Sequence, residues 1–391
     1  MPSSSLGKAL SMWLPVLRSE ELTRDPMRVI YWGTPVVVFR TTSGRLGALE
    51  DLCGHRGIPL SCGSIRGENI RCDFHHFRFN TDGDCVNIPS VFRADDAFQR
   101  KCGVRKFHVR EELGLIWISI EDETAAPFPV DLAGLPEDRI LVTGAFDIGG
   151  DIRVWMDHYL DMPHFAWAHA ESSFFASPER PAAIESPVIG VRADSTYPAR
   201  PGVELDFHIR DDGPSADFAL SVRLLLLLAN VRRRLSGRAR KERVYRMHAR
   251  ADLLTPVCQD TWLTMGRMPV RIIASVNPIA EGKNRFVYTS VADGRGQGRL
   301  GRMLARRLMR DSVLQHLAIE DGQMIAQARY VECEQLRATE FDQTILAMRS
   351  MFANYQREKA KLYPEGSMMH SLEYGPDRSI APSADNSMIE S

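Results

Sequence analysis

Cysteine and histidine occur in two short pairs in the first quarter of the chain, at a spacing suited to a metal centre. Cys53 and His55 form a Cys-x-His pair, and Cys72 and His75 form a Cys-x-x-His pair after sixteen intervening residues. Each pair spans a tight turn, so two such loops can direct four ligands towards one site. Glycine and proline flank both pairs, as expected of loops that turn sharply.

Two kinds of metal centre accept two cysteines and two histidines. A [2Fe–2S] cluster can be held with both histidines on one iron, and a structural zinc ion takes the same ligands tetrahedrally. The first pair favours the cluster, because zinc fingers normally begin with two cysteines. The other cysteines are scattered, as expected of free thiols in a reducing cytoplasm. They are Cys62, Cys85, Cys102, Cys258 and Cys333.

A second group of possible ligands consists of His158, Asp161, His164 and His169. An iron(II) ion that activates O2 needs two histidines and one carboxylate on one face, with the opposite face open. His164 and His169 are the best pair, although five residues turn an ideal helix through about 140°. Pro163 provides the break in the helix that would bring them together. From these residues alone, the alternative is that all four are ordinary polar residues on an aromatic-rich helix.

Taken together, the two groups resemble the motifs of the Rieske non-haem iron oxygenases, in a layout closest to the oxygenase components of the vanillate O-demethylase and phenoxybenzoate dioxygenase type. The first group matches the Rieske signature, with a spacer of sixteen residues that is typical of the oxygenase branch. The second matches the family pattern Asp-x-x-His-x4-His. The resemblance extends over nearly the whole chain and implies that the cluster is held by Cys53, His55, Cys72 and His75.

The resemblance also implies ligands for a mononuclear iron(II). His164 and His169 would bind this iron, and the family places a third ligand, an aspartate, near the start of a late helix. Asp321 matches that position, and Glu320 beside it is the alternative.

Asp161 has a different implied role, because the family uses this aspartate as a bridge between subunits rather than as a ligand. A carboxylate that is hydrogen-bonded to a ligand histidine on each side fixes both imidazoles and shortens the electron path. Such a bridge requires a cluster and an iron from neighbouring subunits, so the resemblance implies a homo-oligomer, by analogy a trimer.

Two positions depart from the family pattern. His76 and Phe77 follow the last cluster ligand, where Gly-Trp is common in the family. His76 is expected to pack or form hydrogen bonds there, with competition as a ligand or a change of the cluster potential as alternatives. His158 stands where the demethylase branch usually has asparagine. We expect it outside the ligand set, and a role near the open coordination position is the alternative.

The implied activity is that of a terminal oxygenase, which uses O2 to hydroxylate, dihydroxylate or dealkylate an apolar aromatic or alicyclic substrate. Electrons from NAD(P)H would arrive through a separate reductase or ferredoxin, because the chain has no flavin, dinucleotide or plant-type ferredoxin motif. A Rieske electron carrier and a zinc-stabilised binding protein are the alternatives from other classes. Candidate pocket residues, for which aromatic core is the commoner role, are Phe165, Trp167, Phe174, Phe175 and Trp262.

The elements that must position these groups indicate an α+β fold with two domains. Short β-rich runs punctuated by glycine, asparagine and aspartate predict an antiparallel Rieske domain at 27–123. It follows a helical or irregular segment at 1–26 that packs on the catalytic domain, and a proline-rich linker at 124–139 comes after it. The expected strands of the Rieske domain are 28–32, 36–40, 46–52, 78–80, 85–88, 105–109 and 115–120.

The catalytic domain is predicted at 140–372, with one larger antiparallel sheet flanked by helices. A polar tail at 373–391 is expected to be disordered. The expected strands of the catalytic domain are 184–192, 204–209, 244–254, 262–268 and 285–292. Its expected helices are 153–169, 304–328 and 340–363.

Composition fits a globular chain with little net charge. Of the 391 residues, 44% are hydrophobic and 25% are charged, and the formal charge is −1. The N-terminus lacks the apolar core of a signal peptide, and the longest apolar run, 224–229, is too short for a membrane span. A cytoplasmic enzyme is therefore expected.

Two arginine-rich stretches, 223–243 and 295–310, are read as solvated surface, as a docking site for an acidic electron donor, or as the source of a substrate-binding arginine. Nucleic acid is not an expected partner, because interleaved aromatic residues and a recognised binding module are missing.

Overall fold

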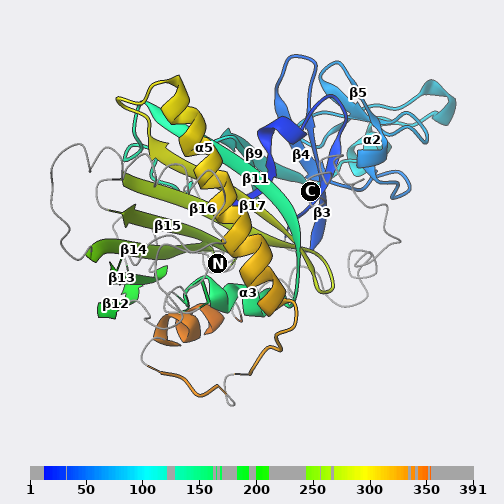
Figure 1. The fold of residues 1–391 in the computed structure, drawn as a ribbon. Helices are drawn as coiled ribbons and strands as arrows, with labels where there is room; N and C mark the ends of the chain where they lie inside the picture. The colour runs from blue at the N-terminus through cyan, green and yellow to red at the C-terminus, as the bar shows by residue number, and fades with distance from the viewer. Residues whose placement is uncertain are drawn as a thin grey trace.

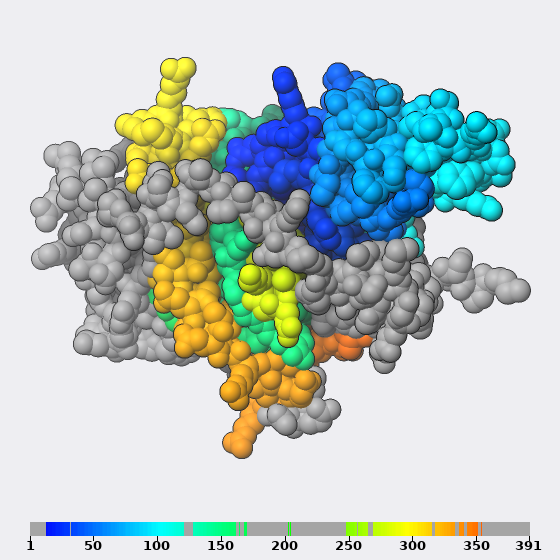
Figure 2. Space-filling view, turned by 90° about the vertical axis from the view of Figure 1, so that its right-hand side faces the viewer, coloured from blue at the N-terminus to red at the C-terminus, as the bar shows by residue number. Residues whose placement is uncertain are grey.

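The computed structural model arranges the chain as an N-terminal lobe (13–120) and a C-terminal lobe (128–350) (Figure 1). Figure 2 shows the N-terminal lobe, in blue to cyan, beside the C-terminal lobe. The residues that the structure describes are 13–31, 33–120, 128–161, 164, 168–169, 183–192, 200–210, 244–255, 257–265, 268–332, 336–339, 342–350 and 353.

Two small antiparallel sheets build the N-terminal lobe. The six-stranded sheet has the order β1-β10-β9-β4-β3-β2, and the four-stranded sheet has the order β5-β6-β7-β8. The expected strands all appear, but the hairpin of β5 and β6 within the sixteen-residue spacer was missed. The bounds are β1 Leu14–Arg18, β2 Met27–Tyr31, β3 Thr34–Arg40, β4 Leu46–Glu50, β5 Ser64–Arg66, β6 Asn69–Arg71, β7 Arg78–Phe79, β8 Cys85–Asn87, β9 Lys106–Glu112 and β10 Leu115–Ser119.

Short helices connect these strands. The single α-helix of the described lobe, α2 (Asp96–Lys101), begins at Asp95, whose side chain accepts a hydrogen bond from the amide of Phe98 and so caps the first turn. The 3-10 turns are η1 Ser19–Glu21, η2 Leu60–Cys62 and η3 Ser90–Phe92.

One wide antiparallel sheet forms the centre of the C-terminal lobe. Its seven strands have the order β11-β17-β16-β15-β14-β13-β12, so all but β11 lie beside their neighbours in sequence. β11 and β16 were not expected, and the strand expected at 262–268 ends at Met265 because a hairpin leads into β16. The bounds are β11 Arg139–Gly149, β12 Ala183–Arg192, β13 Arg200–Arg210, β14 Val244–Thr255, β15 Cys258–Met265, β16 Met268–Ala280 and β17 Lys283–Asp293.

The described helices of the C-terminal lobe follow β11 and β17 in the sequence. α3 (Ile152–His158) follows β11 directly, and α5 (Arg299–Val313) crosses one face of the sheet (Figure 1). α5 continues without a break into a π-helical segment, η5 (Leu314–Asp321), and then into α6 (Gly322–Ile325). The late helix begins earlier than expected and contains a wide turn that its sequence did not reveal. A further helical segment covers 343–350.

The N-terminal segment is a strand, so the expectation of a helical or irregular segment was wrong for its described part. β1 pairs with β10, with Leu14 opposite Ile118, and thus completes the first sheet. The backbone carbonyl of Pro15 also accepts a hydrogen bond of 3.0 Å from the side chain of Asn277 on β16. β1 therefore contacts both lobes at once, because one edge pairs within the first sheet while its residues pack on the second.

The segment expected to be a linker is anchored by its apolar side chains. Phe128, Val130 and Leu135 are buried, and the ring of Phe128 meets the edges of Trp13 and Trp117 at centroid distances of 5.9 and 5.0 Å. This packing joins the two lobes into one hydrophobic core, whereas a second, separate core lies under the Cys/His loops.

Candidate metal centres

The two Cys/His loops have the same backbone hydrogen bonds. In the first, the amide of Cys53 donates to the carbonyl of Ile58 and the amide of Gly57 donates to the carbonyl of Cys53, both at 2.8 Å. In the second, Cys72 donates to Phe77 at 2.9 Å, and the amide of residue 76 donates to Cys72 at 2.8 Å. Each ligand pair therefore sits in a closed turn of the same size.

This repetition explains the departure at His76. Gly57 and His76 occupy equivalent places in the two loops and have φ angles of 70° and 62°. Glycine is the residue that adopts this left-handed conformation without steric cost, so a glycine is the natural choice at this position. His76 is exposed, and the ring that faces His55 is that of His75. His76 thus contributes its backbone to the turn, and the described contacts include none between its side chain and the predicted ligands.

The four predicted cluster ligands converge between the loop tips. The cysteines are buried and the histidines are half-buried, so the thiol side faces the core and the imidazole side faces the surface. The rings of His55 and His75 lie 4.8 Å apart. Nδ1 of His55 is buried and has no hydrogen-bond partner among the described residues. A buried nitrogen without a partner beside two buried thiols fits a metal-binding site, because buried polar groups otherwise have hydrogen-bond partners.

The two thiols lie close enough to share a proton. A hydrogen bond with Cys72 raises the pKa of Cys53 strongly, and the same bond lowers the pKa of Cys72 to about 6. Backbone amides also donate to both sulfurs, from residues 55 and 56 to Cys53 and from residues 74 and 75 to Cys72, and lower both pKa values. Amide donors aimed at sulfur stabilise thiolates and tune the reduction potential of an iron–sulfur cluster.

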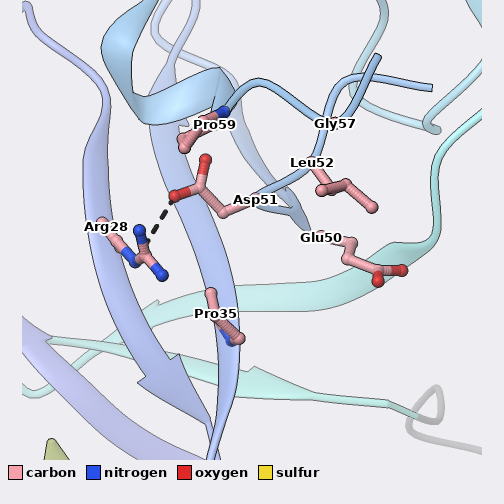
Figure 3. A pocket seen from close by; sticks show the side chains of 7 residues that line it. All are labelled: Arg28, Pro35, Glu50, Asp51, Leu52, Gly57 and Pro59. Carbon is pink, nitrogen blue, oxygen red and sulfur yellow. Dashed lines mark ion pairs between the residues drawn. The ribbon is translucent and has the colours of Figure 1, made fainter. Parts of the chain in front are cut away.

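A buried carboxylate holds the first loop in place. Asp51 accepts hydrogen bonds from the amide and the hydroxyl of Ser61, both at 2.7 Å, and Nε of Arg28 lies 3.6 Å from Oδ2, the oxygen that accepts from the hydroxyl. Figure 3 shows Asp51 and Arg28 facing each other in a pocket at the base of the loop. Asp51 thereby closes the ten-residue span that contains the first ligand pair.

Gly54 brings the first loop against a neighbouring segment. A Cβ atom at this position would lie 2.0 Å from the carbonyl oxygen of Cys102. The ring of Phe77 stacks on His55 at 4.5 Å and fixes the orientation of that imidazole. Both contacts show that the ligand geometry depends on residues around the loops as well as on the ligands.

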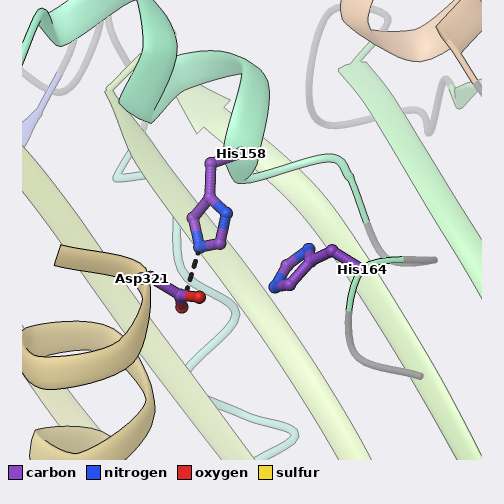
Figure 4. Close-up of side chains that lie close together, drawn as sticks. All are labelled: His158, His164 and Asp321. Atoms are coloured by element: carbon purple, nitrogen blue, oxygen red, sulfur yellow. Dashed lines mark ion pairs between the residues drawn. The ribbon is translucent and has the colours of Figure 1, made fainter. Parts of the chain in front are cut away.

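The second candidate site lies between α3 and the end of the π-helical segment. His158 ends α3, His164 follows in the next connection, and Asp321 ends η5 (Figure 4). One ligand atom from each of these three residues lies within 4.8 Å of the others. Nε2 of His158 is 3.1 Å from Oδ2 of Asp321, and the rings of His158 and His164 are 4.3 Å apart.

His169, which was predicted as a ligand, lies beside this group on the other side of Asp321 and is not one of its three members. Its Nε2 lies 3.4 Å from Oδ1 of Asp321, and its ring is 5.2 Å from that of His164. Nδ1 of His169 lies 2.6 Å from Oε2 of Glu320. Glu320 therefore contacts the ring nitrogen of His169 that points away from the site, as a supporting carboxylate does for a metal-bound histidine.

Asp321 is fully buried among these histidines. Burial raises the pKa of Asp321, but the contacts with His158, His169 and His164 outweigh this effect and lower the pKa below its usual value. Two imidazole nitrogens lie near its carboxylate oxygens, Nε2 of His158 at 3.1 Å from Oδ2 and Nε2 of His169 at 3.4 Å from Oδ1. A π-helical turn widens a helix by one residue per turn and occurs often at functional sites. Here it ends at the one carboxylate that all three histidines surround.

Charged contacts fix α3, which carries His158. Asp151 caps the helix, because its side chain accepts a 2.8 Å hydrogen bond from the amide of Arg153. Asp157 receives a 2.9 Å hydrogen bond from Nε of Arg349 in the late helical segment, and both side chains are mostly buried. Arg349 also donates to the carbonyl of Val331 at 2.7 Å. The ion pair therefore joins α3 to a segment almost two hundred residues away.

Asp161 lies at the edge of this group, with Oδ2 3.9 Å from Nδ1 of His164. Its side chain is 46% exposed, and its backbone carbonyl faces Nδ1 of His164. Partial burial raises the pKa of Asp161, while His158 lowers it. The carboxylate is therefore both next to a site histidine and open to the outside.

Several expected features lie outside the described residues or have another role. Residues 165, 167, 174 and 175, the arginine-rich stretch 223–243 and Cys333 are not described. The ring of Trp262 is covered by the guanidinium of Arg271 at 4.5 Å, as a packing residue would be. In the stretch 295–310, Arg302 pairs with Asp138 and Arg295 pairs with Asp293.

Among the described residues, no helix has the length and apolar character needed to cross a bilayer.

Comparisons with known proteins identify the domain that carries the first site. Residues 12–107 match the family model of the Rieske [2Fe-2S] domain. The chain is 33% identical over 138 residues to the oxygenase subunit of 3-chlorobenzoate-3,4-dioxygenase from Comamonas testosteroni, and 29% identical over 167 residues to the vanillate O-demethylase oxygenase subunit of a Pseudomonas species. These matches cover 34% and 41% of this chain, and 32% and 45% of the relatives. The chain thus spans less than half the length of these relatives.

Structural similarity to solved proteins extends beyond the Rieske domain to the rest of the chain. The crystal structure of dicamba monooxygenase bound to 3,6-dichlorosalicylic acid superposes with a TM-score of 0.66 at 19% identity, covering 90% of this chain and 99% of that one. The predicted fold class is therefore confirmed, with a Rieske [2Fe–2S] domain at the N-terminus and a larger sheet flanked by helices after it.

Proposed function

We propose that this protein is the terminal oxygenase of a Rieske non-haem iron system, in which a Rieske cluster passes electrons to a mononuclear iron(II). The observation that carries the proposal is the convergence of three histidines on the buried carboxylate of Asp321 in a chain that also has a Rieske domain. An electron carrier needs the first site alone, whereas an oxygenase needs both.

The residues of each site fit the group that they are proposed to hold. Cys53, Cys72, His55 and His75 would bind the cluster, with the amide donors to both sulfurs already in place. His164, His169 and Asp321 would bind the iron, in agreement with the two-histidine, one-carboxylate arrangement of non-haem iron oxygenases. When bound, this iron would activate O2 for insertion into the substrate.

The protein side chains around the iron site would orient its ligands. The backbone carbonyl of Asp161 and the carboxylate of Glu320 each face the Nδ1 atom of a histidine, so both imidazoles present Nε2 to the site. Burial of Asp321 and His169 keeps bulk water away from these ligands. This arrangement leaves the protein to place the ligands and exclude water, while the metal supplies the oxygen chemistry.

Electron transfer is proposed to run between subunits of a homo-oligomer, by resemblance a trimer. Asp161 is exposed beside His164, and at the cluster the half-buried His75 is rimmed by exposed Phe74 and Phe92. Docking of one subunit's cluster rim on another subunit's Asp161 would bury these apolar rings and place a carboxylate between the two centres. This role for Asp161 is the one that the family resemblance implies.

The reaction is proposed to use O2, two electrons and two protons, with NAD(P)H as the source of electrons through a separate reductase or ferredoxin. In monooxygenation one oxygen atom enters the substrate and the other leaves as water; in dihydroxylation both enter. The substrate class that we propose is an apolar aromatic or alicyclic molecule, and the relatives named for chlorobenzoate, vanillate and dicamba support an aromatic acid or ether. The finer proposal is the branch of the vanillate O-demethylase and phenoxybenzoate dioxygenase type.

A reducing cytoplasm is the compartment that we propose, because the cysteines that the structure describes are free thiols rather than disulfides.

Single-turnover chemistry tests the function. The protein would be reduced without oxygen, mixed with a panel of substituted benzoates and methoxybenzoates, and exposed to O2, and the hydroxylated or demethylated products would be measured. Asp321→Ala is the matched control, since it leaves the Rieske domain intact. We expect product from the unmodified protein and none from the variant. Re-oxidation of the cluster without any product across a broad panel, despite confirmed mononuclear iron, would favour an electron carrier.

A further inference from the structure

We propose that His158 is a fourth protein ligand of the mononuclear iron, in addition to His164, His169 and Asp321. The inference rests on the proposed function, because it assigns a residue to that same metal site. Figure 4 shows His158, His164 and Asp321 directed towards a common space from three different elements. The separation of His158 from Asp321, 3.1 Å between Nε2 and Oδ2, is the shortest that joins a histidine to this carboxylate.

The distances match those of ligands that share one ion. Metal–nitrogen and metal–oxygen bonds of about 2.1 Å place neighbouring octahedral ligands about 3.0 Å apart and opposite ligands about 4.2 Å apart. The His158–Asp321 separation of 3.1 Å is that of two neighbouring ligands. His169 meets the same carboxylate at 3.4 Å through its other oxygen, and His164 has one ligand atom within 4.8 Å of those of His158 and Asp321.

The principal alternative is that His158 donates a hydrogen bond to Asp321 and only orients it. Such a bond would account for the 3.1 Å contact and for the lowered pKa of Asp321. It would not explain why His164 also places a ring nitrogen within 4.8 Å of the same two groups, as expected when three side chains surround one ion. The edge of His158 also meets Trp155 at 5.7 Å with perpendicular rings, which restricts rotation of the imidazole.

The helix that carries His158 is held firmly towards the site. The Asp151 cap and the Asp157–Arg349 ion pair fix α3 at its start and next to its end. Four protein ligands would leave two of six octahedral positions open when Asp321 binds through one oxygen. Two open positions still accommodate O2 and one water or substrate atom, so the extra ligand is compatible with oxygenase chemistry.

Counting imidazoles at the mononuclear site tests the inference. The iron would be removed from the cluster-containing protein with a chelator and replaced by cobalt(II), and X-ray absorption at the cobalt edge would then report this site without signal from the cluster. The variants are His158→Asn and, as a matched control in the other lobe, His108→Asn on β9. We expect three imidazoles in the unmodified protein and in the control, and two in His158→Asn.

The other outcomes separate this inference from the proposed function. An equal imidazole count in His158→Asn and in the unmodified protein would exclude His158 from the ligand set while leaving the iron site in place. A protein that binds neither iron nor cobalt outside the cluster would overturn both proposals. If His158→Asn does not fold, His158→Gln replaces it in the same comparison.

Discussion

Glu320 and Asp321 are adjacent carboxylates, and the structure gives them different tasks at the iron site. Glu320 contacts Nδ1 of His169 at 2.6 Å, whereas Asp321 faces the Nε2 atoms of two histidines from the centre of the group. Removal of a carboxylate that supports a metal-bound histidine typically lowers metal affinity about 10- to 100-fold. Because each factor of ten is about 1.4 kcal/mol, Glu320→Ala should cost about 1.4 to 2.8 kcal/mol of iron binding.

Competition with a chelator of known affinity measures this effect. We expect Glu320→Ala to bind iron about 10- to 100-fold more weakly, Glu320→Gln to fall between it and the unmodified protein, and Asp321→Ala to retain no mononuclear iron. Glu332, which lies on the surface and pairs with Arg153, provides the control substitution Glu332→Ala. If Asp321→Ala kept its iron while Glu320→Ala lost it, the assignment of ligand and supporting residue would be refuted.

Three further substitutions test the surroundings of the two sites. Gly54→Ala should abolish cluster incorporation, seen as loss of the visible absorption of the cluster, because its Cβ would meet the carbonyl oxygen of Cys102 at 2.0 Å; Gly298→Ala, which has open space around it, should keep the cluster. Arg349→Met leaves Asp157 buried without its partner and should cost about 3 to 5 kcal/mol of unfolding free energy in urea; an effect below about 1 kcal/mol would contradict a structural role for this pair. Asp151→Ala should cost about 1 kcal/mol at pH 7 through loss of the helix cap. Hydrogen bonds from Arg153 lower the pKa of Asp151, so this difference should be complete above about pH 4 and vanish as the pH falls through the folded-state pKa; a difference that grows on acidification would show that the carboxylate is not the stabilising form.

Local patterns predicted the parts of the fold that depend on short-range sequence. The strands of the N-terminal lobe are bounded by glycine and asparagine turns, and each expected run there became a strand. Two strands of the large sheet were harder to read. β11 lies at an edge of the sheet and β16 in its interior. Residues of both strands contact helices as well as strands of the other lobe, so neither has a clean alternation of apolar and polar residues.

The parts of the candidate sites that follow from motif spacing could be predicted from the sequence, and the parts that depend on the folded structure could not. The spacing identified the two Cys/His loops, but the reason for a glycine-like position at His76 appears only in the matching turns of both loops. His158 was expected outside the ligand set, and its closeness to Asp321 depends on α3 meeting a segment some 160 residues away. The wide turn of η5, which decides between Glu320 and Asp321, has no sequence signal of its own.

The central claim is that one chain holds both a Rieske cluster and a mononuclear iron. Electron paramagnetic resonance on anaerobically purified, reduced protein, with and without nitric oxide, tests it most directly. The account predicts a Rieske signal together with a high-spin iron–nitrosyl signal. A Rieske signal alone after confirmed iron reconstitution would contradict the iron site, and a colourless protein that contains zinc would contradict the account as a whole.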